Sequence, residues 1–350
     1  MLRPWDRRSL TELLEQHDLA GAPEEPFPND GWSGSVLTQL RRGDERFILK
    51  RTSRAHDWIA RHTQDRSLRE AVLAASGVVP PAPVVLPHLG AAADGDQAAV
   101  LMPDLSRELI AWERPAGNPG VDPDTLDRVL RAVAALHAGP WHGLPDAVET
   151  PWPWCPLRER LTLLTRPTAE GYRDQGLPVG ERFLTGWDAF DRRAPAGARR
   201  LMETLAADPA PLLAALDRLP AATLHGDLKL ANVALLDDGR VALIDWQMLS
   251  LAPAAVELGW LLVSNVALLP EPPDRVLERY RAMARGVGGG RVLGDWATQV
   301  DLTWIVGLLL RGWRKGLDAE AGVRFPWGGD GAADLAWWCD RAVSAADRRL

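Results

Sequence analysis

Short runs with apolar residues flank a polar turn in the first third of the chain. The runs are Val36 to Leu40 and Arg46 to Lys50, and the turn between them is Arg42-Gly43-Asp44. Two runs of strand length on both sides of a turn are typical of a β-hairpin. Val84 to Leu86 and Ala98 to Met102 supply two further runs of strand length. The pattern therefore predicts a small region that is rich in β-strands.

From residue 122 onward, the apolar residues recur mainly at helical spacing. After Asp122, the residues Leu126, Val129, Leu130 and Val133 are separated by one, three or four positions, which places them on one face of a helix. We expect helices over 9–17 and 67–73 in the first part of the chain, and over 122–139, 158–164, 198–207, 212–219, 274–285, 293–315 and 331–348 in the second. The chain is thus expected to be α+β, with a larger and mainly helical C-terminal part.

One hairpin interrupts the helical part and carries polar residues at its open end. Apolar runs at 233–236 and 241–244 flank Asp237-Asp238-Gly239-Arg240, and an Asp-Gly pair between such runs is a strong hairpin signal. When these runs pair antiparallel, Asn232 and Asp245 finish side by side. An amide oxygen beside a carboxylate suits Mg²⁺, which prefers hard oxygen ligands and shares its coordination shell with substrate phosphates.

Asp227 and Lys229 lie on the loop that leads into this hairpin, within His225-Gly226-Asp227-Leu228-Lys229. The aspartate can orient a hydroxyl group or accept its proton, and the lysine can neutralise charge on a phosphoryl group during transfer. Taken singly, each of these residues is more often a turn, cap or surface residue. The pattern D-x-K-x-x-N, a hairpin and then an apolar residue before Asp requires all of them in order, and this favours the chemical interpretation.

This combination resembles the catalytic and metal-binding loops of the protein-kinase-like superfamily. The His-Gly-Asp opening and Asp245-Trp246 in place of Asp-Phe-Gly are similar to the aminoglycoside phosphotransferase and small-molecule kinase branch. The resemblance implies a two-lobed protein-kinase-like fold, with a small β-rich N-lobe over 1–104 and a larger, mainly helical C-lobe over 105–350. It also implies that Asp227 and Lys229 are catalytic and that Asn232 and Asp245 bind Mg²⁺.

The same resemblance gives the N-terminal strands a role in binding a nucleotide. A loop of small residues before the first strand would present backbone N–H groups to phosphates, and its residues are Gly31, Ser33 and Gly34. Lys50 is then implied to pair with the α- and β-phosphates, while Glu70 on the following helix holds it. The sequence departs from the family pattern at the first glycine of the loop, where Asn29 stands.

Three other features are interpreted through the resemblance. Residues 100–105 correspond to the hinge at which family members bind adenine, and because Pro103 has no N–H, Met102 or Asp104 must supply the donor. His137 ends a helix that is typical of the family, and we expect it to be packed or capping rather than catalytic. Glu257 stands where relatives carry an aspartate that supports the catalytic loop.

The bulk properties exclude several other classes of protein. A net charge of -7 and a pI near 5.6 argue against a nucleic-acid partner. Cys155 and Cys339 stand far apart, so we expect reduced thiols rather than a disulfide or a zinc site. There is no apolar signal core at the N-terminus, and the apolar runs at 258–269 and 302–310 are shorter than the roughly 20 residues of a membrane helix. We expect a cytoplasmic monomer or homodimer with no membrane partner.

The acceptor is the part of the reaction on which the sequence says least. Six carboxylates of the C-terminal part could attract an amine, although each is more commonly a surface group: Asp188, Asp191, Asp301, Glu320, Asp330 and Asp334. The resemblance implies transfer of the γ-phosphate of ATP or GTP, with Mg²⁺, to a hydroxyl group of a small molecule. Acceptors in question are an aminoglycoside or another antibiotic, an amino sugar and a small metabolic alcohol, and the acceptor can be cationic. Antibiotic resistance is one role that fits.

Two rival hypotheses belong to other classes. One is a non-catalytic, nucleotide-binding pseudokinase with a regulatory role. The joint presence of five residues argues against it: Asp227, Lys229, Asn232, Asp245 and Lys50. The other is a protein kinase, which is disfavoured because Asp-Trp-Gln replaces Asp-Phe-Gly and no Ala-Pro-Glu segment follows.

Overall fold

The computed structural model describes residues 3–28, 32–110, 120–144 and 152–350. Its internal contacts divide the chain into two compact units. The first unit comprises Met1–Ile110, Gly139–Pro156 and Ala231–Leu249, and the second comprises Ala111–Ala138, Leu157–Leu230 and Ser250–Leu350. The division into lobes at residues 104 and 105 stays a prediction.

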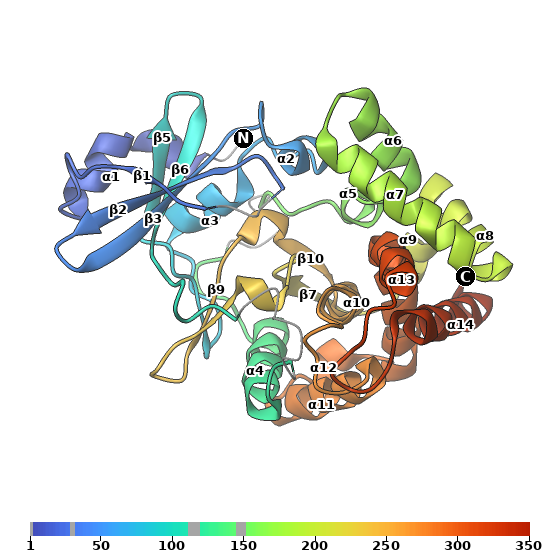
Figure 1. The fold of residues 1–350 in the computed structure, drawn as a ribbon. Helices are drawn as coiled ribbons and strands as arrows, with labels where there is room; N and C mark the ends of the chain where they lie inside the picture. Colours follow the sequence, from blue (N-terminus) through green and yellow to red (C-terminus); the bar gives the residue numbers. More distant parts are fainter. Residues whose placement is uncertain (1–2, 29–31, 111–119, 145–151) are drawn as a thin grey trace. The chain divides into compact units, whose positions relative to one another are not determined.

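A five-stranded antiparallel sheet forms the main part of the first unit (Figure 1). Its strand order is β1-β2-β3-β6-β5, and its strands are β1 (Glu25–Pro26), β2 (Val36–Arg42), β3 (Glu45–Thr52), β5 (Gly90–Asp94) and β6 (Gln97–Pro103). The predicted hairpin at 36–50 is therefore confirmed, with Leu40 opposite Phe47. The strand predicted at 98–102 is confirmed as β6, which pairs with β3 and places Val100 opposite Lys50.

Helix α1 (Leu10–Gln16) covers part of this sheet with apolar side chains. Ser9 accepts a hydrogen bond from the N–H of Glu12, and the Glu12 carboxylate bonds back to Ser9, so a capping box starts the helix. Leu13 then packs into a fully buried cluster with residues of the sheet, which are Leu40, Phe47, Leu49, Ala92, Ala99 and Leu101. Two further helices of this unit are α2 (Trp58–His62) and α3 (Arg69–Ser76), and α3 packs against β5 and β6.

A second, three-stranded sheet in the first unit holds the predicted metal hairpin. Strands β8 (Val233–Leu235) and β9 (Val241–Leu243) pair antiparallel, which confirms the hairpin predicted from the Asp-Gly turn. Strand β4 (Val84–Val85) pairs with β9 in parallel and extends the sheet.

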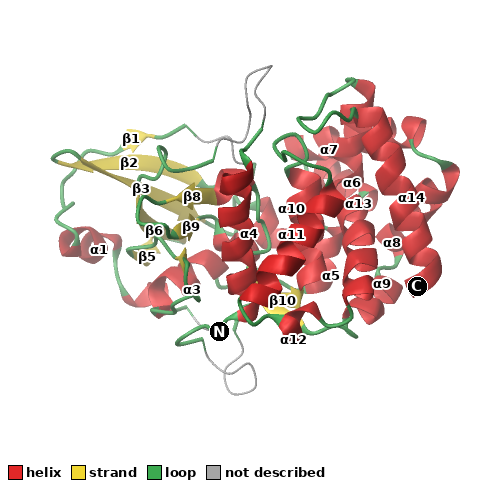
Figure 2. Cartoon of the chain, turned by 90° about the horizontal axis from the view of Figure 1, so that it is seen from below, coloured by secondary structure: helices red, strands yellow, loops and turns green. Residues whose placement is uncertain are grey.

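The second unit is mainly helical, as Figure 2 shows. Its helices are α4 (Pro123–Ala138), α5 (Leu157–Thr162), α6 (Arg166–Asp174), α7 (Pro178–Arg193), α8 (Ala196–Ala207), α9 (Ala210–Leu216), α10 (Ala254–Ser264), α11 (Pro273–Gly286), α12 (Gly290–Leu293), α13 (Trp296–Glu320) and α14 (Gly331–Arg349). Its two short strands, β7 (Ala221–Leu224) and β10 (Ser250–Pro253), pair antiparallel. The expected α+β class, with a small β-rich part and a larger helical part, is confirmed.

Helix α10 lies at the centre of the second unit. Every residue from Ala254 to Val263 is buried. A Cβ on Gly259 would approach the carbonyl oxygen of Thr303 to 2.8 Å, so the missing side chain allows α10 and α13 to pack closely. Because α10 is buried on all sides, it can hold in place the loops that its ends and its polar side chains contact.

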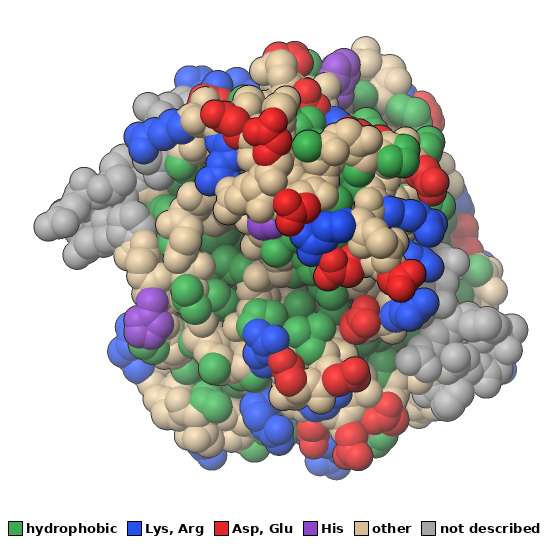
Figure 3. All heavy atoms as spheres, turned by 90° about the vertical axis from the view of Figure 1, so that its left-hand side faces the viewer, with side chains coloured by type: hydrophobic (Ala, Val, Ile, Leu, Met, Phe, Trp, Pro, Cys, Tyr) green, Lys and Arg blue, Asp and Glu red, His purple; other side chains and the backbone are tan. Residues whose placement is uncertain are grey.

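The described surface carries charges of both signs. On the face drawn in Figure 3, side chains of Lys and Arg are interspersed with those of Asp and Glu around a hydrophobic hollow. Within the described residues, no helix combines the length and apolarity that crossing a membrane demands.

Candidate active site

The loop at residues 225–230 in the second unit is held by a buried carboxylate. It follows β7, and Gly226 adopts a left-handed φ of 85°. The two oxygens of Glu257 on α10 accept the backbone N–H groups of His225 at 3.1 Å and Gly226 at 2.6 Å. Glu257 is fully buried, so these bonds fix the backbone just before Asp227 to the central helix. The loop contact expected for Glu257 is present.

His137 and Tyr280 complete the surroundings of this carboxylate. His137 Nε2 lies 2.9 Å from Glu257 Oε2, and its Nδ1 lies 2.8 Å from the Tyr280 hydroxyl. Burial alone would raise the pKa of Glu257, but the hydrogen bond with His137 and the electrostatic influence of His137 and His225 hold this pKa below its ordinary value. Burial raises the pKa of Tyr280. His137 is thus packed against the loop support, as the sequence indicated.

A second buried residue, Asn265, holds the far side of the loop. Its Oδ1 accepts the N–H of Leu230 at 2.8 Å, and its Nδ2 donates to the carbonyl of Leu261 at 2.7 Å. Asn265 caps the C-terminus of α10. The sequence interpretation missed this residue, because a single Asn in an apolar run carries no local sign of its distant partner.

Asp227 and Lys229 lie together between these two supports. Lys229 Nζ is 2.9 Å from Asp227 Oδ2, and the side chains are 28% and 14% exposed respectively. The N–H of Lys229 also donates to the carbonyl of Asp227 at 2.8 Å. A partly exposed carboxylate on an anchored loop can meet a hydroxyl group from solvent, which is the geometry that a general base requires.

In the first unit, one buried ammonium contacts two carboxylates. Lys50 on β3 lies 2.6 Å from Glu70 on α3 and 2.7 Å from Asp245. Burial alone would lower the pKa of Lys50, but the charges of Asp245 and Glu70 hold it above its ordinary value. Likewise, burial would raise the pKa of Glu70, but Lys50 and a contact with His88 hold it well below its ordinary value. Lys50 therefore stays charged.

Asn232 and Asp245 lie at the open end of the β8–β9 hairpin. The N–H of Ile244 donates to the carbonyl of Asn232 at 3.0 Å. Because Asp245 directly follows Ile244, this bond places Asp245 near Asn232. Asp245 has a left-handed backbone with φ 65° and ψ 61°, a conformation that non-glycine residues adopt mainly at functional or strained sites. Among the described residues, no group of three or more His, Cys, Asp or Glu forms a metal site by itself. One amide and one carboxylate oxygen fit Mg²⁺, whose remaining ligands are usually water and substrate phosphates.

The loop of small residues lies partly outside the described residues. Gly31 is outside them, whereas Ser33 and Gly34 are described. Gly34 has a φ of 97°, and a Cβ there would lie 2.4 Å from the carbonyl oxygen of His56. The carbonyl of Ser33 accepts the N–H of Trp58 at 3.2 Å. This part of the loop is thus anchored to the segment that enters α2.

The predicted hinge residues lie at the end of β6. Met102 is opposite Ile48 on β3 and is buried. The N–H of Asp104 donates to the carbonyl of Arg46 at 3.0 Å, and its carboxylate accepts the Gln39 amide at 2.9 Å. Contact of either residue with adenine stays a prediction.

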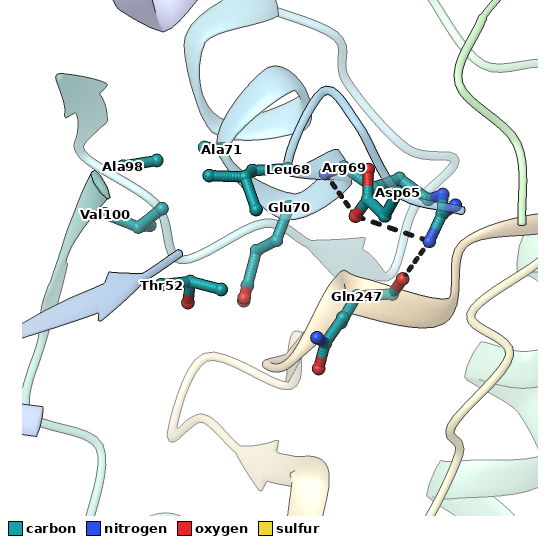
Figure 4. A pocket seen from close by; sticks show the side chains of 9 residues that line it. All are labelled: Thr52, Asp65, Leu68, Arg69, Glu70, Ala71, Ala98, Val100 and Gln247. Atoms are coloured by element: carbon teal, nitrogen blue, oxygen red, sulfur yellow. Dashed lines mark hydrogen bonds and ion pairs between the residues drawn. The ribbon is translucent and has the colours of Figure 1, made fainter. Parts of the chain in front are cut away.

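A cavity of about 10 Å³ lies next to Glu70, between α3 and the sheet, and has room for about one water molecule. Arg69 is one of the residues that line it (Figure 4): its backbone N–H donates to Asp65 at 2.8 Å, and its guanidinium donates to the carbonyl of Gln247 at 2.5 Å. Arg69 is buried. This bond ties α3 to the segment directly after Asp245.

The six carboxylates considered for the acceptor all have partners. Arg166 contacts Asp188 and Asp191, and Arg192 contacts Glu320. The remaining contacts are those of Asp301 with Arg348 and Arg349, of Asp334 with Lys315, and of Asp330 with the N-terminus of α14. A larger hollow of about 360 Å³ in the second unit is lined by apolar residues and Asp217. None of the catalytic, nucleotide-binding, metal-binding or acceptor-binding residues predicted from the sequence lines it.

This chain is similar to known proteins in sequence and in structure. Residues 25–294 match the sequence profile of the phosphotransferase enzyme family, and a search of curated proteins found no match. Among solved structures, an aminoglycoside-3'-phosphotransferase of type VIII has 20% identity, with 82% of this chain and 95% of that chain covered and a TM-score of 0.42.

Two other solved structures are similar over nearly the whole chain. A macrolide 2'-phosphotransferase from Brachybacterium faecium has 18% identity, with 96% of this chain and 97% of that chain covered, and a TM-score of 0.44. A choline kinase from Streptococcus pneumoniae has 12% identity, coverage of 95% and 98%, and a TM-score of 0.45. These identities and TM-scores are low, whereas the profile match spans more than half of the chain.

Proposed function

Because the chain belongs to the phosphotransferase enzyme family and has its protein-kinase-like fold class, we propose that it transfers the γ-phosphoryl group of ATP or GTP to a hydroxyl group of a small molecule. The observation that carries this proposal is the anchored loop: Asp227 and Lys229 form a pair at 2.9 Å, directly after the two N–H groups that Glu257 binds. The anchored loop holds a base and a cation ready without reorganisation.

In the proposed reaction, Asp227 orients the acceptor hydroxyl and takes up its proton as the hydroxyl oxygen attacks the γ-phosphorus. A bond forms between that oxygen and phosphorus, and the bond to the bridging oxygen of the nucleotide breaks, so the nucleoside diphosphate leaves with its electron pair. Lys229 neutralises charge on the transferred group. Lys50 already carries its charge in the structure because Glu70 and Asp245 stabilise it, and it binds the α- and β-phosphates.

Asn232 and Asp245 would hold Mg²⁺ in this proposal. When bound, the ion would neutralise phosphate oxygens and orient them for transfer. The acceptor is proposed to be an antibiotic such as an aminoglycoside, an amino sugar or a small metabolic alcohol. Because the six carboxylates considered above already have partners, an amine would have to displace one of these contacts to bind there.

The test is a turnover assay with a matched pair of variants. Purified protein is incubated with ATP or GTP, with Mg²⁺ or EDTA, and with a panel of sugars, amino alcohols, antibiotics and one protein substrate, and phosphorylated products are identified by mass spectrometry and ³¹P NMR. We expect Mg²⁺-dependent transfer to a small molecule and a loss of roughly 10³-fold or more in Asp227→Asn.

The control is Asp238→Asn in the exposed turn of the β8–β9 hairpin, where Asp238 forms an ion pair with Arg240. This variant should retain the wild-type rate. Nucleotide binding without turnover on any acceptor would support a pseudokinase instead. Transfer to the protein substrate alone would contradict the small-molecule proposal.

A further inference from the structure

Arg160 on α5 reaches the peptide bond that leads into Asp227. Its Nε donates to the carbonyl oxygen of Gly226 at 3.0 Å, across 66 positions of sequence. Arg160 is only 1% exposed. Burying a guanidinium is costly unless charge-assisted contacts compensate for the lost water, so its contact with a loop carbonyl next to Asp227 is a specific feature of this site.

Trp260 forms the surface on which this guanidinium lies. The Arg160 guanidinium carbon is 4.4 Å from the centroid of the Trp260 ring, within the range of a cation–π contact. Trp260 stands three positions after Glu257 on α10, so the two side chains share one face of that helix. The central helix therefore supports both the carboxylate and the platform for the arginine.

Glu257 and Arg160 together form hydrogen bonds with both backbone polar groups of Gly226, its N–H and its carbonyl. Glu257 accepts the N–H of Gly226 at 2.6 Å, and Arg160 donates to its carbonyl at 3.0 Å. The residue between these two bonds has a left-handed φ of 85°, a conformation with few restraints of its own in glycine. Fixing both polar groups of Gly226 fixes the plane of the next peptide, and with it the direction in which Asp227 leaves the backbone.

We propose that Arg160, stacked on Trp260, is a positioning residue for Asp227 and acts on it through the carbonyl of Gly226. This inference rests on the proposed function, since it assigns to Arg160 the orientation of the proposed base. A purely structural role would stabilise the second unit without affecting the chemical step selectively. A positioning role instead requires that the rate effect of Arg160 depend on the Asp227 carboxylate.

The test compares Arg160→Met, which keeps the aliphatic stem but removes the donor and the charge, with Arg160→Lys, which keeps a cationic donor. Arg158→Met is the matched control, because Arg158 is exposed on the same short helix. We expect Arg160→Met to lower kcat about 10- to 100-fold, with the nucleotide KM within roughly twofold of wild type. Arg160→Lys should recover part of this loss, and Arg158→Met should match wild type.

A double variant separates positioning from general destabilisation. In an Asp227→Asn background, Arg160→Met should leave the residual rate nearly unchanged, because two residues that act as a unit are not additive. An unchanged kcat in Arg160→Met, or an equal loss in both backgrounds, would overturn the inference while leaving the proposed function intact. If neither wild type nor Arg158→Met turns over any acceptor, the proposed function itself fails, and the positioning role fails with it.

Circular dichroism melts show whether Arg160→Met is folded. If it is not, Arg160→Lys and Trp260→Phe replace it, since both keep most of the buried volume. We then expect kcat to fall about 3- to 10-fold at an unchanged nucleotide KM, and a wild-type kcat in both variants would overturn the inference.

Discussion

Lys50 and Asp245 stand 195 positions apart in the sequence, and their side chains are in contact at 2.7 Å. Glu70 contacts the same ammonium at 2.6 Å and also accepts the backbone N–H of Trp246 at 3.3 Å. Glu70 therefore links the lysine to the segment that carries Asp245. The proposed phosphate-binding lysine and one proposed metal ligand belong to a single ionic network within the first unit.

Lys50→Met should separate the structural role of this network from its chemical role. Removing the ammonium leaves the buried Glu70 carboxylate uncompensated, and we expect a loss of about 3 kcal/mol in the free energy of unfolding. In the double variant Lys50→Met/Glu70→Gln, the uncompensated charge is absent, so most of this stability should return. Turnover should stay at least about 100-fold below wild type in both variants. Urea unfolding and steady-state kinetics provide the two measurements, and a double variant that regains turnover would contradict the role given to Lys50.

Asn232→Ala tests the proposed metal ligands without touching the Lys50 network. We expect the Mg²⁺ concentration for half-maximal turnover to rise by about tenfold or more, because one of two protein oxygen ligands is lost. Asp245→Asn should show the same rise, together with a lower rate at saturating Mg²⁺. Asp237→Asn, in the exposed turn of the same hairpin, is the control. If Asn232→Ala has the wild-type Mg²⁺ dependence, Asn232 is not a ligand.

The parts of this site that could be predicted from the sequence are those with a strong local pattern. The Asp-Gly turn and its two flanking apolar runs determine the β8–β9 hairpin, and the pairing then brings Asn232 next to Asp245. The apolar run from Phe47 to Leu49, next to the turn at 42–44, likewise predicted the strand of Lys50. In each case, hydrogen bonding between neighbouring segments is sufficient to specify the geometry.

The contacts that escaped prediction join distant segments without such a pattern. Arg160 meets Gly226 across 66 positions, and Gln247 donates to Asp57 across 190 positions. Strand β7 is the short sequence Ala-Ala-Thr-Leu, and its partner β10 follows only after the whole β8–β9 hairpin. Such contacts depend on tertiary packing, and the partner of a short segment without clear alternation cannot be predicted from its sequence.

Asp57 should make the stability of the protein depend on pH. It is buried, caps α2 by accepting the N–H of Ala60 at 2.9 Å, and accepts the Gln247 amide at 2.7 Å. Despite these bonds, burial raises the pKa of Asp57 from 3.8 to about 6. Between these two values the folded state binds more protons than the unfolded state, so the free energy of unfolding falls as pH rises from about 4 to 6.

Asp57→Asn removes this titration while keeping a residue that caps helices well. The unfolding free energy of wild type minus that of the variant should fall by about 2 kcal/mol between pH 4 and pH 6, and should be constant above pH 7. Urea unfolding at intervals of one pH unit measures this difference. A difference that is independent of pH across this range would show that Asp57 does not retain its proton in the fold.

Gly34 should be far less tolerant of a side chain than Gly43. Both residues have a positive φ, of 97° and 58° respectively, but a Cβ on Gly34 would lie 2.4 Å from the backbone oxygen of His56, whereas none of the described atoms lies within 4 Å at Gly43. Gly43→Ala should therefore cost about 1 kcal/mol for backbone strain alone. Gly34→Ala should cost at least about 2 kcal/mol, because backbone must also move. Equal losses in thermal or urea unfolding would mean that the loop is not anchored at His56.

Glu257→Gln should weaken the loop that carries Asp227, although the two side chains have nearly the same shape. The carboxylate accepts the N–H of Gly226 at Oε1 and that of His225 at Oε2, but an amide has only one acceptor oxygen, so one N–H would face an NH₂ group. In this fully buried position, we expect a loss of about 2–4 kcal/mol in the free energy of unfolding. A fall in kcat that is larger than the fall in nucleotide affinity should accompany it, because the loop and not the nucleotide site is disturbed. Glu278→Gln, whose side chain is 58% exposed on α11, is the control, and a Glu257→Gln variant with wild-type stability and kcat would show that the loop does not depend on this carboxylate.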